Sequence, residues 1–289
     1  MKDIRTKNEY KFDADAAVRS LHWALTEASD FSSARQRLHN MISQSANGSL
    51  QIFRGKSCVN FYSDRKYLSK KSNQLYVLAR KRYYITLLKT IEQFARLPSN
   101  PTKYKKKCDD AFAELEKLIR NYAAGNLQLD RILLSRQQYN WYHANFKQKR
   151  PPDYNDFRIP QGNSVRSKSE QNIGYELDRF AVPCHYEHQL HLNVQRLVSI
   201  LEAYDSRTGC ITLHPDYTMM LADGSILYWE HEGLILHLDY RKNALERIGL
   251  MRICNIPDSR IIQTIEAQAN DRAACARIIQ TRILPYLWF

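Results

Sequence analysis

The sequence predicts a mixed α/β domain in its C-terminal half and a mainly helical domain with a β-hairpin in its N-terminal half. Three observations indicate this division. Residues 1–138 show mostly helical periodicity, and residues 165–289 alternate between helical and extended patterns. Residues 139–164 between them hold three prolines and follow neither pattern, so we expect a linker there.

In the N-terminal half, apolar residues at helical spacing predict helices over about residues 16–29, 32–45, 71–96 and 104–122. Residues 50–62 differ from their surroundings. Leu50 and Ile52 alternate with polar neighbours, Arg54-Gly55-Lys56 supplies a turn, and the alternation then resumes. This pattern predicts a β-hairpin.

In the C-terminal half, Ser167 is the expected N-cap of a helix over residues 168–180, with Glu170 three residues on, the arrangement of a capping box. Strands over residues 210–221 and 225–231 are joined by a turn of the Asp-Gly kind. The remaining elements are a strand over 185–192, an insert at 193–207, a helix over 238–254, a strand over 260–265 and a helix over 270–283. The order α-β-(insert)-β-β-α-β-α predicts a mixed sheet flanked by helices.

The net charge of +13 is unevenly placed along the chain. Residues 1–150 hold 29 basic against 13 acidic side chains, whereas residues 151–289 hold 14 basic against 17 acidic ones. A basic half joined to a mildly acidic half is what an enzyme acting on a polyanion would show. A well-solvated helical surface rich in lysine would show the same balance.

Composition excludes several other classes. No run of about 18 apolar residues appears, and the N-terminal stretch lacks the apolar segment of a signal peptide, so we expect no membrane partner. The six cysteines are scattered singly, which disfavours both a zinc ribbon and a disulfide framework. A reduced, cytoplasmic location is the simplest expectation.

Acidic residues interrupt two strands that are otherwise apolar and aromatic. Antiparallel pairing about the Asp-Gly turn can bring Asp216 and Glu230 side by side, and Glu232 projects to the same face as Glu230. Converging carboxylates repel one another unless a cation lies between them, and Mg²⁺ (or Mn²⁺) prefers such oxygen ligands. Acidic pairs on adjacent strands are also often merely solvated, but an unpaired charge in an apolar strand is costly, which favours a functional role.

An ordered set of short motifs resembles the PD-(D/E)XK, or restriction-endonuclease-like, nucleases over about residues 164–266. The motifs are Val-Arg-Ser-Lys-Ser-Glu at 165–170, Tyr186-Glu187, Pro215-Asp216-Tyr217-Thr218 and Tyr228-Trp229-Glu230-His231. The resemblance implies an αβββαβ core with a mixed central sheet. It also implies that Asp216 is the metal-binding aspartate, that Glu230 opens the (D/E)XK motif, and that Glu170 completes the metal site.

The sequence departs from this family at position 232, where Glu232 stands in place of the motif lysine. Some members carry E-x-E and are active, so Glu232 would take a proton from water or bind a second metal. Alternatively, Lys242 or Lys168 reaches in from elsewhere. A third reading is an inactivated fold that binds nucleic acid without cutting it, and a fourth is a different fold.

Two further residues are candidates for the surroundings of the site. His214 shares the face of Asp216, and Glu187 belongs to the first strand of the core. In the N-terminal half, basic residues interleaved with aromatic ones suit a phosphate backbone and stacked bases. These candidate nucleic-acid-binding residues are Arg54, Lys56, Arg65, Lys66, Lys70, Lys71, Arg80, Lys81 and Arg82.

Taken together, the residues and the resemblance predict a Mg²⁺-dependent endonuclease that hydrolyses phosphodiester bonds in DNA. Nucleases of this family often occur in phage-defence systems and mobile elements, so the resemblance suggests one of these settings. The alternatives are an inactive nuclease fold that binds nucleic acid, and a helical half that docks a partner protein. Nucleases of this kind often cut both strands as dimers, which makes a homodimer reasonable.

Overall fold

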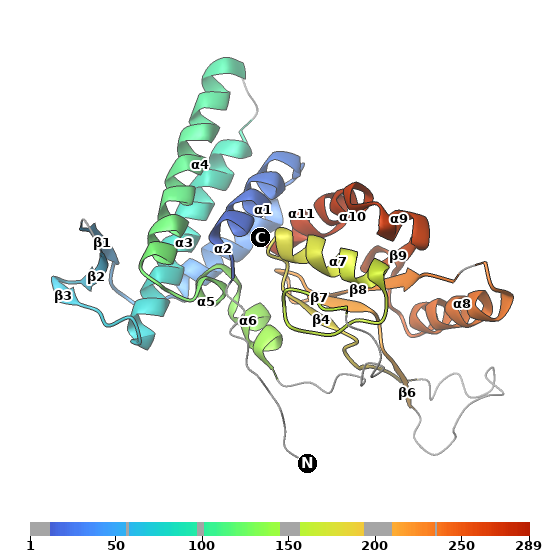
Figure 1. The fold of residues 1–289 in the computed structure, drawn as a ribbon. Coiled ribbons are helices and arrows are strands. Elements are labelled where there is room, and N and C mark those ends of the chain that lie inside the picture. The colour runs from blue at the N-terminus through green and yellow to red at the C-terminus, as the bar shows by residue number, and fades with distance from the viewer. Residues whose placement is uncertain (1–11, 56–57, 97–100, 145–156, 194–209, 235) are drawn as a thin grey trace, which may run out of the picture. The chain divides into compact units, whose positions relative to one another are not determined.

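A computed structural model describes residues 12–55, 58–96, 101–144, 157–193, 210–234 and 236–289 (Figure 1). The described residues form two compact units. One runs from Phe12 to Asn140 and includes Gln280–Phe289, and the other lies between Trp141 and Ile279. The last ten residues therefore belong to the helical unit and not, as the sequence pattern suggested, to the C-terminal domain.

The four helices expected in the N-terminal half are confirmed to within a few residues at each end. They are α1 (Ala14–Glu27), α2 (Ser32–Ser43), α3 (Asn73–Phe94) and α4 (Pro101–Ala124). Asp13 caps the start of α1, where its carboxylate accepts a hydrogen bond of 2.6 Å from the backbone N–H of Ala16. Two short helices, α5 (Leu129–Leu133) and α6 (Arg136–His143), were not predicted. Because α6 extends to His143, the predicted linker over 139–164 begins too early.

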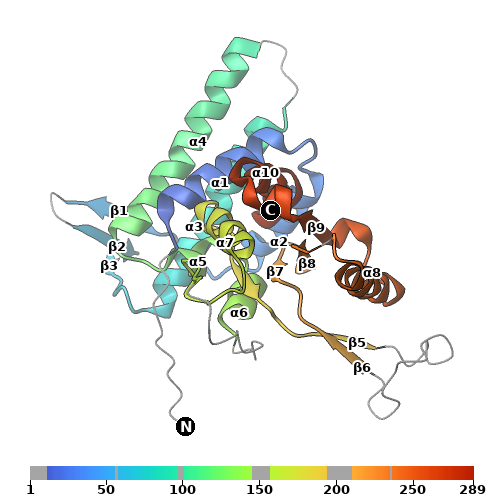
Figure 2. The same cartoon turned by 45° about the vertical axis from the view of Figure 1, so that its right-hand side comes forward.

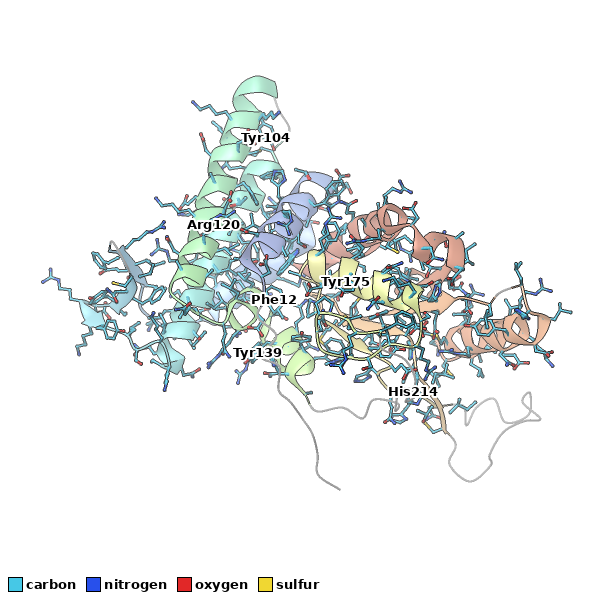
Figure 3. All side chains as sticks on the ribbon, in the orientation of Figure 1. Phe12, Tyr104, Arg120, Tyr139, Tyr175 and His214 are labelled. Carbon is cyan, nitrogen blue, oxygen red and sulfur yellow. The ribbon has the colours of Figure 1, made fainter. Side chains whose placement is uncertain are left out.

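Helix α3 forms the centre of the helical unit, with a fully buried row that includes Leu75, Leu87 and Ile91. It packs along α4, and two tyrosine hydroxyls join the two helices. Tyr122 donates to the carbonyl of Ala79 at 2.9 Å, and Tyr104, near the start of α4 (Figure 3), donates to the carbonyl of Phe94 at 2.7 Å. The second bond satisfies a carbonyl at the end of α3 that the helix itself leaves unpaired.

The predicted hairpin is confirmed and carries a third strand. Strand β1 (Gln51–Arg54) pairs antiparallel with β2 (Val59–Ser63), which pairs antiparallel with β3 (Lys66–Tyr67). Phe61 is fully buried and its ring lies 6.4 Å from that of Tyr122, so one face of this small sheet packs on α4.

The chain ends inside the helical unit. After the π-helical turn η3 (Ile279–Ile283), the short α11 (Leu284–Leu287) packs against α1. Trp288 is buried, meets the ring of Phe12 edge-on at 6.1 Å, and donates its indole N–H to the hydroxyl of Ser20 at 2.7 Å. The single predicted helix over 270–283 is therefore several pieces, α9 (Glu266–Asn270), α10 (Arg272–Ile278) and η3.

The second unit confirms the predicted mixed sheet flanked by helices. Its elements in chain order are α7 (Lys168–Arg179), β4 (Cys184–Tyr186), β7 (Tyr217–Met220), β8 (Ile226–Glu232), α8 (Leu238–Ile253), the 3-10 turn η2 (Asp258–Arg260) and β9 (Ile261–Ile265), with two more strands between β4 and β7. The sheet order is β4-β7-β8-β9. The first two pairings are antiparallel. Strands β8 and β9 pair in parallel, and helix α8 is the crossover that connects them.

Two long predicted strands are each broken in the structure. The stretch 185–192 divides into β4 and β5 (Leu190–Asn193), and 210–221 divides into β6 (Cys210–Leu213) and β7. Strands β5 and β6 pair with each other and run away from the rest of the sheet (Figure 2). Three residues on each side, 187–189 and 214–216, separate the two ladders, so the register is unchanged across the break. The predicted insert at 193–207 lies almost wholly outside the described residues.

Helices α7 and α8 cover opposite faces of this sheet. On one face, the hydroxyl of Tyr217 donates to the carbonyl of Glu170 in α7 at 2.6 Å. On the other, Ile248 and Met251 of α8 pack with Tyr228 and with β5 and β6. Because neighbouring residues of a strand face opposite sides, Glu230 and Glu232 share the face of Tyr228 and look towards α8.

We expect Trp288→Ala to lower the free energy of unfolding by about 3–5 kcal/mol, since it removes a buried aromatic ring and leaves a cavity. Urea denaturation followed by far-UV circular dichroism measures the change. Tyr286→Ala, at an exposed position two residues away, is the matched control and should stay within about 0.5 kcal/mol of wild type. Equal stability of the two variants would show that the C-terminal segment does not hold the helical unit together.

Candidate functional site

Residues 187–189 and 214–216 interrupt the pairing between the β4–β7 ladder and the β5–β6 ladder, and three carboxylates lie in line across the sheet at this break. Tyr186 pairs with Tyr217 and Tyr217 with Trp229, so the next position along is Glu187 beside Asp216 beside Glu230. The backbone keeps this alignment, because the N–H of Glu187 donates to the carbonyl of Asp216 at 3.0 Å. The predicted proximity of Asp216 and Glu230 agrees with this register, although Asp216 precedes β7 and is not within a strand.

Asp216 is held by one short hydrogen bond in acidic surroundings. Its carboxylate accepts the backbone N–H of His231 at 2.6 Å. Burial, followed by the charges of Glu230 and Glu170, raises the pKa of Asp216 well above its ordinary value, although the His231 bond and Arg247 oppose the shift. A carboxylate with a raised pKa at neutral pH gains from any cation that approaches it.

Glu230 is paired with Arg247 of α8. The side chain of Glu230 is 2% exposed, and the Arg247 guanidinium lies 2.9 Å from one of its oxygens and 2.8 Å from the other. The same guanidinium donates to the carbonyl of His214 at 2.9 Å. Burial raises the pKa of Glu230 to about 7, with Arg247 opposing and Glu232 adding to the shift. Burial works against the charge on Arg247, but Glu230, Asp216 and Glu232 together raise its pKa.

Glu232 lies two positions beyond Glu230 on β8 and has fewer partners than Asp216 or Glu230. The residue is 8% exposed, and its carboxylate makes no hydrogen bond or ion pair within the part of the chain that the structure describes. Burial raises the pKa of Glu232, while Arg247 and His231 oppose the shift. Its oxygens are not among the fully enclosed polar atoms of the described residues, so a water molecule or a cation can reach them.

Glu170 reaches the site from the start of α7. Its carboxylate accepts the hydroxyl of Tyr186 at 2.6 Å and the backbone N–H of Arg166 at 2.9 Å. Its charge is close enough to raise the pKa of Asp216. The predicted capping box forms by half: Ser167 caps the N–H of Glu170 at 3.1 Å, but the Glu170 side chain reaches Arg166 instead of Ser167.

Neither lysine proposed as a replacement for the motif lysine enters the site. Lys242 is exposed on α8 and lies 4.0 Å from Glu246, and Lys168 is exposed and bonds Gln171 at 2.8 Å. Arg247 supplies the positive charge instead, and sequence reasoning missed it. A signal was present, because Arg247 falls on the same face of the helix as the buried Ala244 and Met251.

Three neighbours of the site have other partners. Glu187 forms an ion pair with Arg166. Its backbone has a φ of 51°, in the left-handed region. The ring of His214 lies 3.3 Å from the carbonyl of Glu187, which ties the two edges of the break together. His231 faces away from the carboxylates, since its ring lies 3.1 Å from Glu266 and 3.4 Å from the hydroxyl of Thr264.

The predicted nucleic-acid-binding residues belong to the other unit, and three of them are engaged within it. Arg80 donates to the carbonyl of Arg131, Lys81 to that of Ala46 at 3.0 Å, and Arg82 to that of Leu50 at 2.6 Å. These bonds indicate a structural role. Lys70 is half-buried, and Arg54, Arg65, Lys66 and Lys71 are exposed. Lys56 lies outside the described residues.

Metal binding was tested against the arrangement of donors. No group of three or more His, Cys, Asp or Glu side chains in the described ranges is placed to hold a metal ion. Mg²⁺, however, is usually held by only one or two carboxylates, together with water and substrate phosphate. Asp216 lies beside Glu230 in this register, and Glu230 is paired with Arg247, so a cation at this pair would have to share Glu230 with the guanidinium.

Comparisons with family models, with curated proteins and with solved structures find no match to this chain. Among the helices described by the structure, none is long and apolar enough to cross a bilayer.

The acidic cluster should make stability depend on pH. The folded-state pKa of Glu230, about 7, lies above its ordinary 4.5, so its contribution is fully present below pH 4.5 and is lost as pH rises through about 7. Asp216 and Glu232 shift in the same direction. We expect Glu230→Gln to lose less stability than wild type between about pH 5 and about pH 8 in urea unfolding. Glu246→Gln, an exposed change on α8, should keep the wild-type dependence, and an unchanged slope in Glu230→Gln would contradict this assignment.

Proposed function

We propose that this protein is a divalent-metal-dependent nuclease that hydrolyses phosphodiester bonds in DNA, on a restriction-endonuclease-like core. The observation that carries the proposal is the cluster of Asp216, Glu230 and Glu232, whose pKa values are all raised at the end of two paired strands. Carboxylates with perturbed pKa values cluster at functional sites, because catalysis and ion binding require them. The element order α7-β4-β7-β8-α8-β9 supports the same family.

The donor chemistry agrees with Mg²⁺ or Mn²⁺. Asp216, with Glu230 and Glu170, whose charges act on it, would hold the ion through carboxylate oxygens. When bound, such an ion supplies Lewis-acid activation of a scissile phosphate and of water. It would also offset the repulsion that raises the pKa of Asp216.

The residues of the chain have separate tasks in this proposal. Glu232 has a raised pKa and no donor among the described residues, so it suits the role of a base that takes a proton from the attacking water. Arg247 remains charged and cannot act as a base. Its planar guanidinium suits a phosphate oxygen, so it would stabilise the charge that develops on the phosphate, the task expected of the motif lysine. Asp216, oriented by the His231 N–H, would fix the position of the reacting phosphate through the ion.

The alternative of an inactive fold is favoured by one observation. Arg247 lies within bonding distance of both oxygens of Glu230, so this acid is compensated without a metal. A protein that had lost catalysis could retain this ion pair for stability alone. Cleavage and metal-binding measurements separate the two readings.

We expect the protein to nick or cut plasmid DNA when Mg²⁺ or Mn²⁺ is added, and Asp216→Asn to slow cutting by about 100-fold or more, because it removes a charge that the ion requires. The same ion should raise the melting temperature near pH 8 in wild type but not in Asp216→Asn. Glu246→Gln is the control for both measurements. Cutting that survives Asp216→Asn would identify a contaminant, and a melting temperature indifferent to metal in wild type would favour the inactive fold.

Arg247 can be tested for its electrostatic role. We expect Arg247→Gln to lower the cutting rate by about 100-fold and Arg247→Lys by less, because lysine keeps the charge but loses the planar pair of donors. Loss of the guanidinium also raises the pKa of Glu230 further, so the pH profile of cutting should move to higher pH. A rate loss without that movement would mean that Arg247 acts through stability alone.

A further inference from the structure

We propose that the outer face of the β1-β2-β3 sheet is a stacking platform for single-stranded nucleic acid. The proposal rests on the proposed function only for the choice of DNA as the polymer, and it names the form of strand that the helical unit would hold. The surface is defined by the rings of Phe53, Tyr62 and Tyr67, and Arg65 lies in the turn that joins the strands of Tyr62 and Tyr67.

The two faces of this sheet differ in the way that the strand alternation requires. Val59, Phe61 and Ser63 of β2 point inward and are buried. Tyr62 points to the opposite side and is paired with Tyr67 of β3. An outer face of this kind is normally lined by polar side chains, and here it carries aromatic rings.

The three rings form a continuous chain. Phe53 meets Tyr62 edge-on with centroids 5.2 Å apart, and Tyr62 meets Tyr67 edge-on at 5.7 Å. The two outer members remain open, since Phe53 is 57% exposed and Tyr67 is 55% exposed. By contrast, Tyr83 and Tyr84 on α3 are buried in the helical core.

The basic side chains of this small sheet and of the segment that follows it have no acidic partner among the residues that the structure describes. Residues 50–71 hold six basic side chains against the single acid Asp64. Five of these basic side chains are described by the structure, and none forms an ion pair with another described residue. They are Arg54, Arg65, Lys66, Lys70 and Lys71. This separates them from Arg80, Lys81 and Arg82, whose donors are taken by backbone carbonyls. Arg54 and Lys66 pair with the inward-facing Val59 and Ser63, so they belong to the other face of the sheet. The positive charge available to a polyanion beside the rings therefore comes from Arg65 in the turn between β2 and β3, and from Lys70 and Lys71, which follow β3 in the chain.

The turn between β2 and β3 displays one of these cations at a conformational cost. Asp64 and Arg65 have φ values of 49° and 64°, which asparagine and glycine adopt more readily than arginine does. Fold stability alone would favour asparagine at position 65. An exposed arginine held there is better explained by a contact that it makes.

Single strands fit this surface better than duplex DNA or an acidic peptide. In a duplex the bases are already stacked on one another, so exposed rings would gain little from contact. A single strand offers a base to each open ring while its phosphates lie along the cations. An acidic peptide would satisfy the cations but would leave the rings unused.

The test is fluorescence anisotropy of the full-length protein with labelled oligo-dT, with a duplex of the same length, and with polyglutamate as a competitor, all in EDTA. We expect Phe53→Ala/Tyr67→Ala to bind oligo-dT about tenfold or more weakly, with a much smaller effect on duplex binding. Tyr286→Ala, which removes an equally exposed ring elsewhere, and Lys89→Gln, which removes an exposed charge from α3, are the matched controls.

A second variant guards against misfolding. Arg65→Asn should keep or raise the melting temperature, because asparagine suits the turn, and should still weaken oligo-dT binding. Equal binding by wild type and the double aromatic variant, equal losses for single strand and duplex, or full competition by polyglutamate would each overturn the platform. Because EDTA prevents metal-dependent cutting, the binding measurement does not depend on whether the protein is a nuclease. If the protein cuts DNA but the Phe53→Ala/Tyr67→Ala variant binds oligo-dT as wild type does, the platform is overturned and the nuclease proposal is not.

Discussion

Burial of carboxylates where β7 begins and β8 ends is the constraint around which the second unit is organised. Burial raises the pKa of Asp216, Glu230 and Glu232, and the charge of Glu230 adds to the shift of Asp216 as that of Glu232 adds to the shift of Glu230. Arg247 partly compensates them. The ion pair is possible because α8 crosses the same face of the sheet and presents Arg247 beside its buried residues Ala244 and Ile248.

The break between the β4–β7 ladder and the β5–β6 ladder is what allows Asp216 to take its orientation. Had β4–β5 and β6–β7 been continuous, Asp216 would be one more ladder residue with its neighbours close on both sides. The interruption of three residues on each strand keeps the register and frees Asp216 to turn towards the N–H of His231.

Much of this could be predicted from local sequence, and the remainder could not for identifiable reasons. Asp216 and Glu230 were predicted as neighbours because a short turn propagates its register into both strands. The break was missed because apolar alternation continued through it, although Pro215 was a sign that a central strand does not pass there. Arg247 was missed because its role depends on which face of α8 meets the sheet. Arg80 and its neighbours, judged by charge alone, were candidates for nucleic acid until their backbone partners were known.

The return of the last ten residues to the helical unit has a consequence for how the protein is made and inherited. On the ribosome, most of the helical unit is synthesised first but lacks Trp288 until the second unit has been made, so its core is complete only after that. No single cut in the chain separates the units intact. A recombination event that exchanged the second unit would have to leave both ends of the first in place, and the two units are therefore expected to travel together through evolution.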